Sequence, residues 1–320
     1  MLTYDNLRDR VLLLLDEAGN TSTTADLVED ALNASHRRVC LTRPWPFMKW
    51  FRDETLTTVS GVKTYALNSN VAKLLYARDT VNREYLSFVP LRNWENAGID
   101  PEDTDAGRPD ATYGGTWPVS TQPSTAAVVS IVSSSASDGA GEQVYFRGIL
   151  ASGETAEETL TANGVTPVPS TNSYVYILNL HKIGTWVGSL TVSTPSETLL
   201  VLTSGVAARN FPTIEFVQTP AASKVYAYRF QRIPKVLTLD GDVPEVPYPY
   251  SEILVYDTLI DIAGYNTELS NKHLNIWGER YNELYKQLND AMDESIVGSQ
   301  PRYVRDMDGV SGHPVTLWSH

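Results

Sequence analysis

The chain has 320 residues, which is long for one domain and indicates about two. Hydrophobic residues make up 42% of it, so the chain can form folded cores and is not disordered throughout. The net charge of −13 disfavours a protein that grips nucleic-acid phosphate or anionic lipid, although a protein that only surrounds DNA remains allowed.

The single cysteine, Cys40, excludes an intrachain disulfide framework and is typical of a protein made in a reducing cytosol. It lies in an apolar-rich helical stretch, where a buried thiol is expected rather than a nucleophile. No segment reaches the roughly 18 consecutive apolar residues of a membrane span. The first apolar run, residues 11–15, lacks the basic flank of a signal peptide, so we expect no membrane association.

The first predicted elements are two helices. Apolar residues recur at helical spacing from Tyr4 to Ala18, and Gly19 supplies a stop. A second helix is predicted to begin with Thr23 as its N-cap and to end before Pro44. Both helices carry an apolar stripe, so each is expected to pack against a partner.

The pattern then changes to short strands. Alternating residues predict strands at 50–59, 63–67, 71–81 and 85–91, with turns between them. The stretch 100–115 is acidic and rich in Gly and Pro, and is predicted to be a loop.

The composition shifts again at about residue 118, where Ser, Thr, Val and Gly become dominant. Short strand-like runs follow one another with turn residues between them, which is typical of a β-sandwich with immunoglobulin-like architecture. The predicted strands are 127–133, 143–150, 157–162, 173–182, 188–193 and 198–202.

The last third returns to strands and then to helices. Strands are predicted at 213–217 and 225–230, and helices at about 250–263 and 270–292. The final stretch, 296–320, has no regular period and is predicted to be an extended arm.

The predicted fold class is therefore α+β. Four helices from the two chain ends form a core with a small antiparallel β region, and an immunoglobulin-like β-sandwich is inserted between them. The predicted divisions are 1–117 for the first half of the core, 118–210 for the insert, 211–295 for the second half of the core, and 296–320 for the arm.

Side chains suited to chemistry are sparse. The sequence has no phosphate-binding loop, serine-hydrolase elbow or His-Glu-x-x-His motif. The histidines, at positions 36, 181, 273, 313 and 320, are scattered, although distant residues can converge in space. Asp240 and Asp242 could be an acid–base pair, but aspartates beside a turn glycine more often bind their own backbone. We expect no catalytic residue and no metal site.

Aromatic residues recur along the last helix. Trp277, Tyr281 and Tyr285 lie on one helical stripe, and a ligand platform is one interpretation of them. A place in the core is the favoured interpretation, because the same stripe is what buries an amphipathic helix.

Three stretches carry a family resemblance. Residues 26–33, Asp-Leu-Val-Glu-Asp-Ala-Leu-Asn, lead to Arg-Pro-Trp-Pro-Phe at 43–47. Lys-Thr-Tyr-Ala-Leu at 63–67 is followed by Val-Ala-Lys-Leu at 71–74. The stretch 228–247 runs from Tyr-Arg-Phe through an acidic turn to Val-Pro-Glu-Val-Pro. In this order they resemble the head-to-tail adaptor, or head completion, proteins of short-tailed and related tailed phages.

The resemblance implies a structural virion protein without enzymatic activity or cofactor, which forms a dodecameric ring beneath the portal protein. The ring would bridge the portal to a downstream tail or nozzle protein, and DNA would pass through its channel without sequence-specific binding. The protein would be made in the host bacterial cytoplasm and would end at the head–tail junction, the neck of the virion. Acidic residues of the two C-terminal helices would contact neighbouring copies; these are Asp257, Asp261, Glu279 and Glu283.

The resemblance also implies that the arm binds between portal subunits. The arm carries apolar side chains that can fill pockets and arginines that can pair with carboxylates, which a solvated tail, the alternative, does not need. The residues expected to bind the portal are Arg302, Tyr303, Val304, Arg305, Val310, Pro314, Val315, Leu317 and Trp318.

Two other functions remain open. The insert could be a glycan- or receptor-binding module of a phage tail or baseplate, with Tyr145, Tyr174, Tyr176 and Trp186 as candidate aromatic contacts. A cell-wall hydrolase would need a carboxylate in an apolar cleft with a raised pKa.

Overall fold

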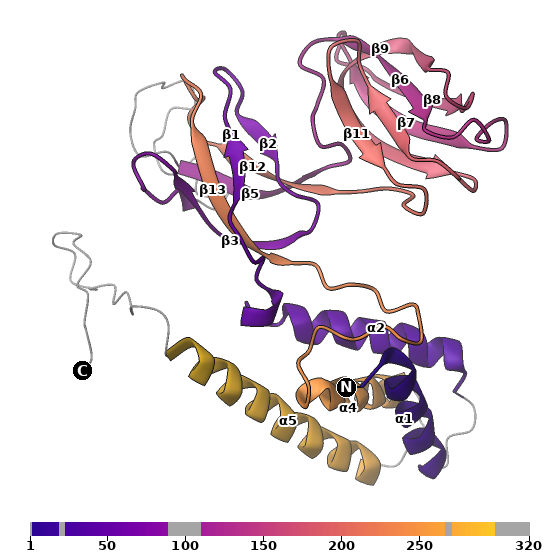
Figure 1. The fold of residues 1–320 in the computed structure, drawn as a ribbon, viewed down its shortest axis with the longest axis vertical. Coiled ribbons are helices and arrows are strands. Elements are labelled where there is room, and N and C mark those ends of the chain that lie inside the picture. Colours follow the sequence, from indigo (N-terminus) through magenta and orange to yellow (C-terminus); the bar gives the residue numbers. More distant parts are fainter. Residues whose placement is uncertain (1, 19–22, 89–109, 266–270, 298–320) are drawn as a thin grey trace. The chain divides into compact units, whose positions relative to one another are not determined.

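The computed structural model describes residues 2–18, 23–88, 110–265 and 271–297 (Figure 1). Over these residues the protein is mixed α/β, with four α-helices and several antiparallel sheets, which confirms the predicted mixture. Contacts divide the chain into two compact units, Met1–Lys49 with Ile233–His320 and Trp50–Arg232. The predicted boundaries at 117/118 and 210/211 both fall within the second unit, so the predicted division remains a proposal.

The first unit, called here the helical unit, contains all four α-helices of the described residues. Thr3 caps the first helix by accepting the Asn6 amide, and Thr24, one residue after the predicted position, caps the second by accepting the Leu27 amide. The elements are α1 (Tyr4–Glu17), α2 (Ala25–Leu41), a 3-10 turn (Pro46–Met48), a second 3-10 turn (Tyr250–Glu252), α4 (Ile253–Tyr265) and α5 (Asn271–Val297).

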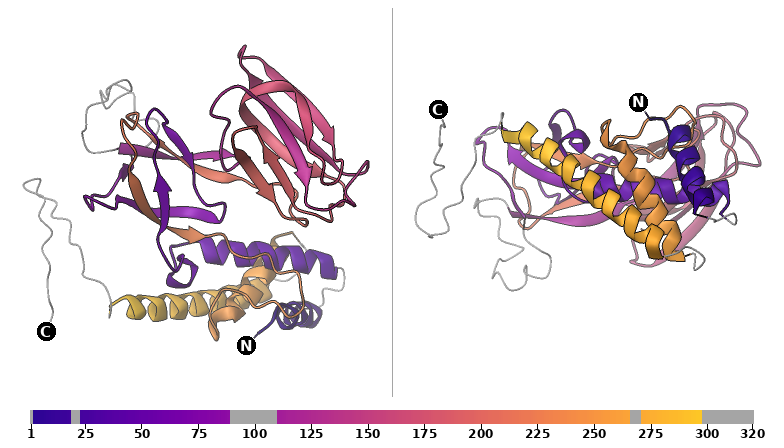
Figure 2. Two further views of the ribbon diagram at one scale, coloured as in Figure 1. Left: turned by 45° about the horizontal axis from the view of Figure 1, so that its top comes forward. Right: turned by 90° about the horizontal axis from the view of Figure 1, so that it is seen from below.

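Helix α4 contacts each of the other three helices (Figure 2). It is apolar around much of its circumference, which is typical of a helix with partners on several sides. Full burial of each Leu or Ile stabilises the fold by roughly 1.5–3 kcal/mol relative to exposure. The shared cluster of buried side chains includes Leu7, Val11, Val28, Leu32, Leu254, Leu259, Trp277 and Leu288. No helix among the described residues is long and apolar enough to cross a membrane.

Helix α5 extends beyond the predicted end at Met292 and reaches Val297. The residues between them are compatible with a helix, and the first strong breaker in the sequence is Gly298. The first two residues of the predicted arm, 296 and 297, are therefore helical, and positions 298–320 lie outside the described residues.

The second unit, called here the β unit, holds two small sheets. One has the strand order β1-β13-β3 and the other β2-β12-β5-β4. They share a cluster of buried side chains that includes Phe216, Tyr226, Tyr228 and Phe230. The strands are β1 (Glu54–Thr57), β2 (Thr64–Ala66), β3 (Val71–Asp79), β4 (Ser87–Phe88), β5 (Asp110–Trp117), β12 (Phe211–Phe216) and β13 (Val225–Arg232).

Strand β5 corrects the predicted loop at 100–115. Residues 110–117 are a strand that pairs with β12, whereas 100–109 lie outside the described residues. Gly115, one of the glycines that suggested a loop, fits the strand pairing instead, because the Thr213 side chain occupies the space beside it.

The remaining strands form one six-stranded sheet with the order β11-β10-β6-β9-β7-β8. The first half of β9 pairs with β6 and the second half with β7, and side chains from all of these strands meet in one core that includes Phe146 and Tyr174. Strands β5 and β12, which enter and leave this region, pair with each other through Trp117 and Phe211. The strands are β6 (Ala127–Ser133), β7 (Gln143–Leu150), β8 (Thr155–Thr161), β9 (Val168–Ile183), β10 (Leu190–Ser193) and β11 (Thr198–Leu202).

Candidate functional site

Residues 233–249, called here the linking segment, carry or contact several polar groups of the helical unit. Within it, one oxygen of Asp242 accepts the amides of Thr238 at 2.9 Å and Leu239 at 3.0 Å, while the other pairs with the Lys235 ammonium. The Lys235 ammonium and these two amides lower the pKa of Asp242 to about 2. Asp242 therefore closes a turn, as the favoured interpretation of the sequence expected.

Asp240 does not join Asp242 in a catalytic pair. Its exposed carboxylate lies 3.4 Å from a guanidinium nitrogen of Arg8. That same arginine contacts Glu29 at 3.1 Å, so it links α1, α2 and the linking segment.

Hydrogen bonds to the backbone of the linking segment hold it against α1 and α2. The Asp242 carbonyl accepts the Tyr4 amide at 2.7 Å. The Asn33 side chain donates to the Leu237 carbonyl at 3.0 Å and accepts the Leu237 amide at 2.8 Å. The sequence analysis missed this role of Asn33, because an asparagine within a helix gives no signal that its side chain will bind a distant backbone.

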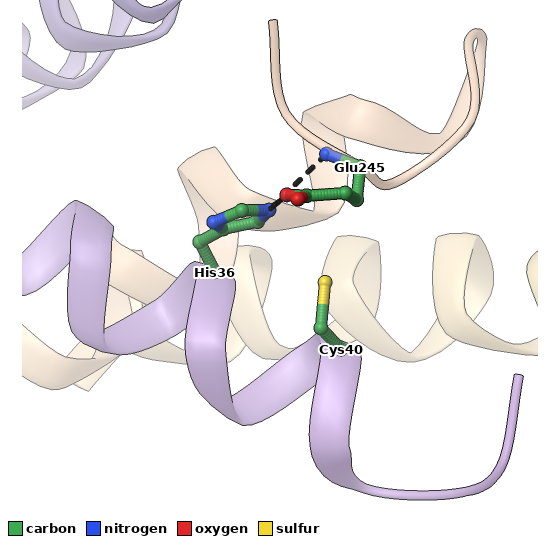
Figure 3. A group of neighbouring side chains, drawn as sticks. All are labelled: His36, Cys40 and Glu245. Carbon is green, nitrogen blue, oxygen red and sulfur yellow. Dashed lines mark hydrogen bonds and ion pairs between the residues drawn. The ribbon is translucent and has the colours of Figure 1, made fainter. Parts of the chain in front are cut away.

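A second group missed by the sequence analysis is buried where α2 meets the linking segment (Figure 3). His36 and Cys40 project from α2, and Glu245 comes from the linking segment. A carboxylate oxygen of Glu245 lies 2.8 Å from His36 Nε2, and the Glu245 amide donates to that nitrogen at 3.2 Å. His36 and Cys40 are fully buried, and the ligating atoms of the three residues all lie within 4.8 Å of one another. These are atoms that can bind a metal ion.

A shallow depression lies between α2 and α4. It is lined by Arg38, Asp257, Ile260, Asp261 and Gly264. Arg38 donates to Asp257 at 2.9 and 2.7 Å, and its third nitrogen lies 3.6 Å from Asp261. Burial alone would lower the pKa of Arg38, but the two carboxylates outweigh it and raise that pKa. The two acidic residues of α4 that were expected to contact a neighbouring copy thus pair with Arg38 of the same chain.

The two acidic residues expected on α5 lie on an exposed side of the helix. Glu279 is exposed, and Glu283 is 2.8 Å from Arg280 one turn away. The arm residues expected to bind the portal, Arg302 to Trp318, lie outside the described residues.

The predicted aromatic stripe of α5 belongs to the core rather than to a ligand platform. Trp277 is buried, and Tyr281 and Tyr285 pack against the same apolar cluster. Burial raises the pKa of Tyr281 to about 12. Tyr285 packs edge-on against Trp45, with ring centres 6.0 Å apart.

The fold defines a mixed α/β protein in which segments from both chain ends make a helical unit and the middle of the chain makes a β unit. The family model described as SU10 adaptor protein matches residues 2–158, from α1 into the six-stranded sheet. This match confirms the resemblance to phage head-to-tail adaptors. No curated protein matches the chain.

Proposed function

We propose that this chain is a structural, non-enzymatic protein of the phage neck, where copies of it form a dodecameric ring between the portal and the tail. The observation that carries the proposal is the SU10 adaptor match over residues 2–158. That stretch includes helices α1 and α2 of the helical unit and strands β1 to β5 of the β unit, so it covers elements of both units. An adaptor role requires surfaces for partners rather than a reaction centre.

The architecture is compatible with this role. Helices from both chain ends share one apolar cluster, which we propose is the four-helix core of each ring subunit. The six-stranded sheet would be an inserted sandwich of immunoglobulin-like architecture; this is supported by the two halves of β9, which pair with different strands, and by the single core that all six strands share. Its entry and exit strands are paired, as an insertion requires.

Assembly would use the exposed acidic residues of α5, Glu279 and Glu283, and the arm. The pairing of Asp257 with Arg38 leaves Asp257 less suited to a neighbour than these two. Twelve arms that bind weakly one by one would attach the ring firmly as a set, because each bound copy raises the effective concentration of the next. DNA in the channel would not bind tightly to the protein, because the negative charge of the chain repels the DNA phosphates.

The test combines electron microscopy with a truncation. We expect the full chain to be mostly monomeric alone and to form a ring when mixed with its portal protein. Deletion of residues 299–320 should leave the circular dichroism spectrum and unfolding midpoint unchanged and abolish attachment to the portal. Undiminished attachment of the truncated chain would reject the hypothesis that the arm binds the portal. Absence of the protein from the neck of assembled particles would reject the proposed adaptor function.

One observation favours a second candidate, a glycan-binding face on the six-stranded sheet. The rings of Tyr145 on β7 and His181 on β9 lie 5.0 Å apart, beside exposed Arg147 and Asn179 on the same face. Aromatic and polar groups together are what a sugar requires. Of the other aromatic candidates, Tyr174 and Trp186 are buried in the core and cannot contact a glycan directly. Glycan-array binding by the full chain that is lost in Tyr145→Ala would support this function, and no binding by the full chain would reject it.

A further inference from the structure

We propose that His36, Cys40 and Glu245 form a binding site for one divalent transition-metal ion, for which zinc is the best chemical match (Figure 3). The site would fasten the linking segment to α2. It goes beyond the proposed adaptor function and does not depend on it.

The backbone brings the three ligands together from two distant parts of the chain. His36 and Cys40 are four residues apart on α2, so their side chains lie on one face of the helix. Glu245 is 209 positions from His36 in the sequence, and its own amide donates to His36 Nε2 at 3.2 Å. The linking segment is held in place independently by Asn33, which makes two hydrogen bonds to Leu237.

A neighbouring backbone group orients the Glu245 carboxylate. One of its oxygens accepts the Lys235 amide at 3.0 Å, and the other points at His36 Nε2, 2.8 Å away. Metal-ligating carboxylates are commonly positioned in this way by a hydrogen bond to the oxygen that does not bind the metal.

The Glu245 amide and the Glu245 carboxylate oxygen both approach His36 Nε2, and the nitrogen cannot bond to both of them. If the nitrogen accepts the Glu245 amide, its lone pair faces the carboxylate oxygen and repels it. If it carries a proton for the carboxylate, it cannot accept the amide. A metal ion bound at the Nε2 lone pair replaces the Glu245 amide as the partner of that nitrogen and also accepts an electron pair from the carboxylate oxygen, so the two groups no longer repel each other.

The charges in the site also match a divalent cation. Cys40 and His36 are fully buried and the Glu245 side chain is 10% exposed, so an uncompensated charge here would be costly. On binding, the Cys40 thiol releases its proton to solvent, and the thiolate, the carboxylate and a neutral imidazole then carry two negative charges. A divalent ion brings the total to zero.

The donor set selects the metal. A thiolate with an imidazole suits zinc and other late first-row ions, whereas calcium and magnesium require oxygen ligands. Zinc bonds of about 2.0–2.3 Å in a tetrahedron separate the ligands by roughly 3.3–3.7 Å. The ligating atoms here lie within 4.8 Å of one another, and His36 Nε2 and the Glu245 oxygen, 2.8 Å apart, have to separate by roughly 0.5 Å to reach that geometry, which a small side-chain rotation achieves. Three protein ligands leave a fourth position for water.

The test measures metal content and a spectrum of the bound ion. The full chain, purified from zinc-supplemented cells and dialysed against metal-free buffer, should retain about one zinc per chain by mass spectrometry. Cobalt added to the metal-free protein should produce a thiolate-to-cobalt charge-transfer band, which requires Cys40 because the chain has no other cysteine.

Variants then assign the site. Cys40→Ser and Glu245→Gln keep the shape of each side chain and remove its charge, so each should lower zinc retention to below about a tenth of the wild-type value. His181→Ala, which changes a histidine of the β unit, is the matched control and should retain zinc fully. Circular dichroism checks that each variant is folded.

Two results would overturn the proposal. One is a wild-type chain that retains no zinc and gives no cobalt charge-transfer band, which requires no variant to fold. The other is a folded Cys40→Ser or Glu245→Gln chain that binds zinc as well as the wild type does.

Discussion

The guanidinium group of Arg38 donates two hydrogen bonds to one carboxylate oxygen of Asp257, from Nε at 2.9 Å and from Nη2 at 2.7 Å. The arginine belongs to α2 and the aspartate to α4, so the pair joins the N-terminal and C-terminal helices. The Asp257 side chain is only 11% exposed, whereas that of Arg38 is 45% exposed. Loss of the arginine would therefore leave a nearly buried, negatively charged carboxylate without the positive charge and the two hydrogen bonds that Arg38 supplies.

Arg38→Met should destabilise the helical unit by about 1–2 kcal/mol. This lies below the cost of breaking a fully buried pair, because solvent screens the half-exposed guanidinium. Urea unfolding followed by circular dichroism measures the change. Arg280→Met is the matched control, since Arg280 and Glu283 form an exposed pair on α5, and it should cost less than about 0.5 kcal/mol. Equal effects of the two substitutions would show that the burial of Asp257 does not matter.

Trp45→Phe should destabilise the helical unit by about 1–3 kcal/mol. Trp45 is fully buried, and its Nε1 donates to the Val39 carbonyl at 2.7 Å. The phenylalanine leaves that carbonyl without this donor and leaves a cavity beside Tyr285. Thermal unfolding is the measurement. Phe51→Leu, at a position 76% exposed, is the control and should change stability by less than about 0.5 kcal/mol.

The Asp242 carboxylate should make stability depend on pH in the acid range. Its pKa is lowered to about 2 in the folded chain, so the ionised form favours folding. This stabilisation is complete above about pH 4, near the ordinary carboxyl pKa, and is lost as the pH falls through about 2. Urea midpoints measured between these pH values should fall less in Asp242→Asn than in the wild type.

Asp240→Asn is the control for this titration. Asp240 has an exposed carboxylate beside Arg8, so this variant should keep the acid dependence of the wild type. If instead Asp242→Asn keeps that dependence and Asp240→Asn loses it, the assignment to Asp242 is wrong.

Gly148→Ala should destabilise the six-stranded sheet by about 1–3 kcal/mol. A Cβ atom there would lie 2.5 Å from a ring carbon of Tyr174 and 2.6 Å from the Tyr176 carbonyl oxygen. Thermal unfolding of the full chain measures the effect. Gly139→Ala is the control, because no atom lies within 4 Å of its added Cβ, and it should be close to neutral. A neutral Gly148→Ala would mean that β9 shifts freely to admit the methyl group.

Local patterns predicted most of the elements. The strands at 127–133, 143–150 and 198–202 have the predicted limits, and both N-terminal helices are present. Errors occurred where one residue type is typical of two structures, as glycine is of loops and of closely paired strands. Gly114 and Gly115 suggested a loop and lie in β5, where Gly115 leaves room for the Thr213 side chain of β12 and Gly114, with φ +147°, lies at a shift in the strand register.

The polar groups of the helical unit could be predicted only in part. The turn formed by Asp242 follows from its position beside Gly241, and its interpretation as a backbone acceptor is confirmed. The group of His36, Cys40 and Glu245 was not predicted, because the sequence shows only a scattered histidine, a cysteine in a helix and a glutamate between prolines.

The sequence by itself determined where helices and strands form, because caps, apolar periods and turn residues act within a few positions of one another. Only the tertiary structure decided which of these segments meet. Leu237 reaches Asn33 and Glu245 reaches His36 across more than 200 positions, after the whole β unit has intervened in the chain. Such contacts depend on the packing of α1, α2 and the linking segment as a body, and no local pattern encodes that packing.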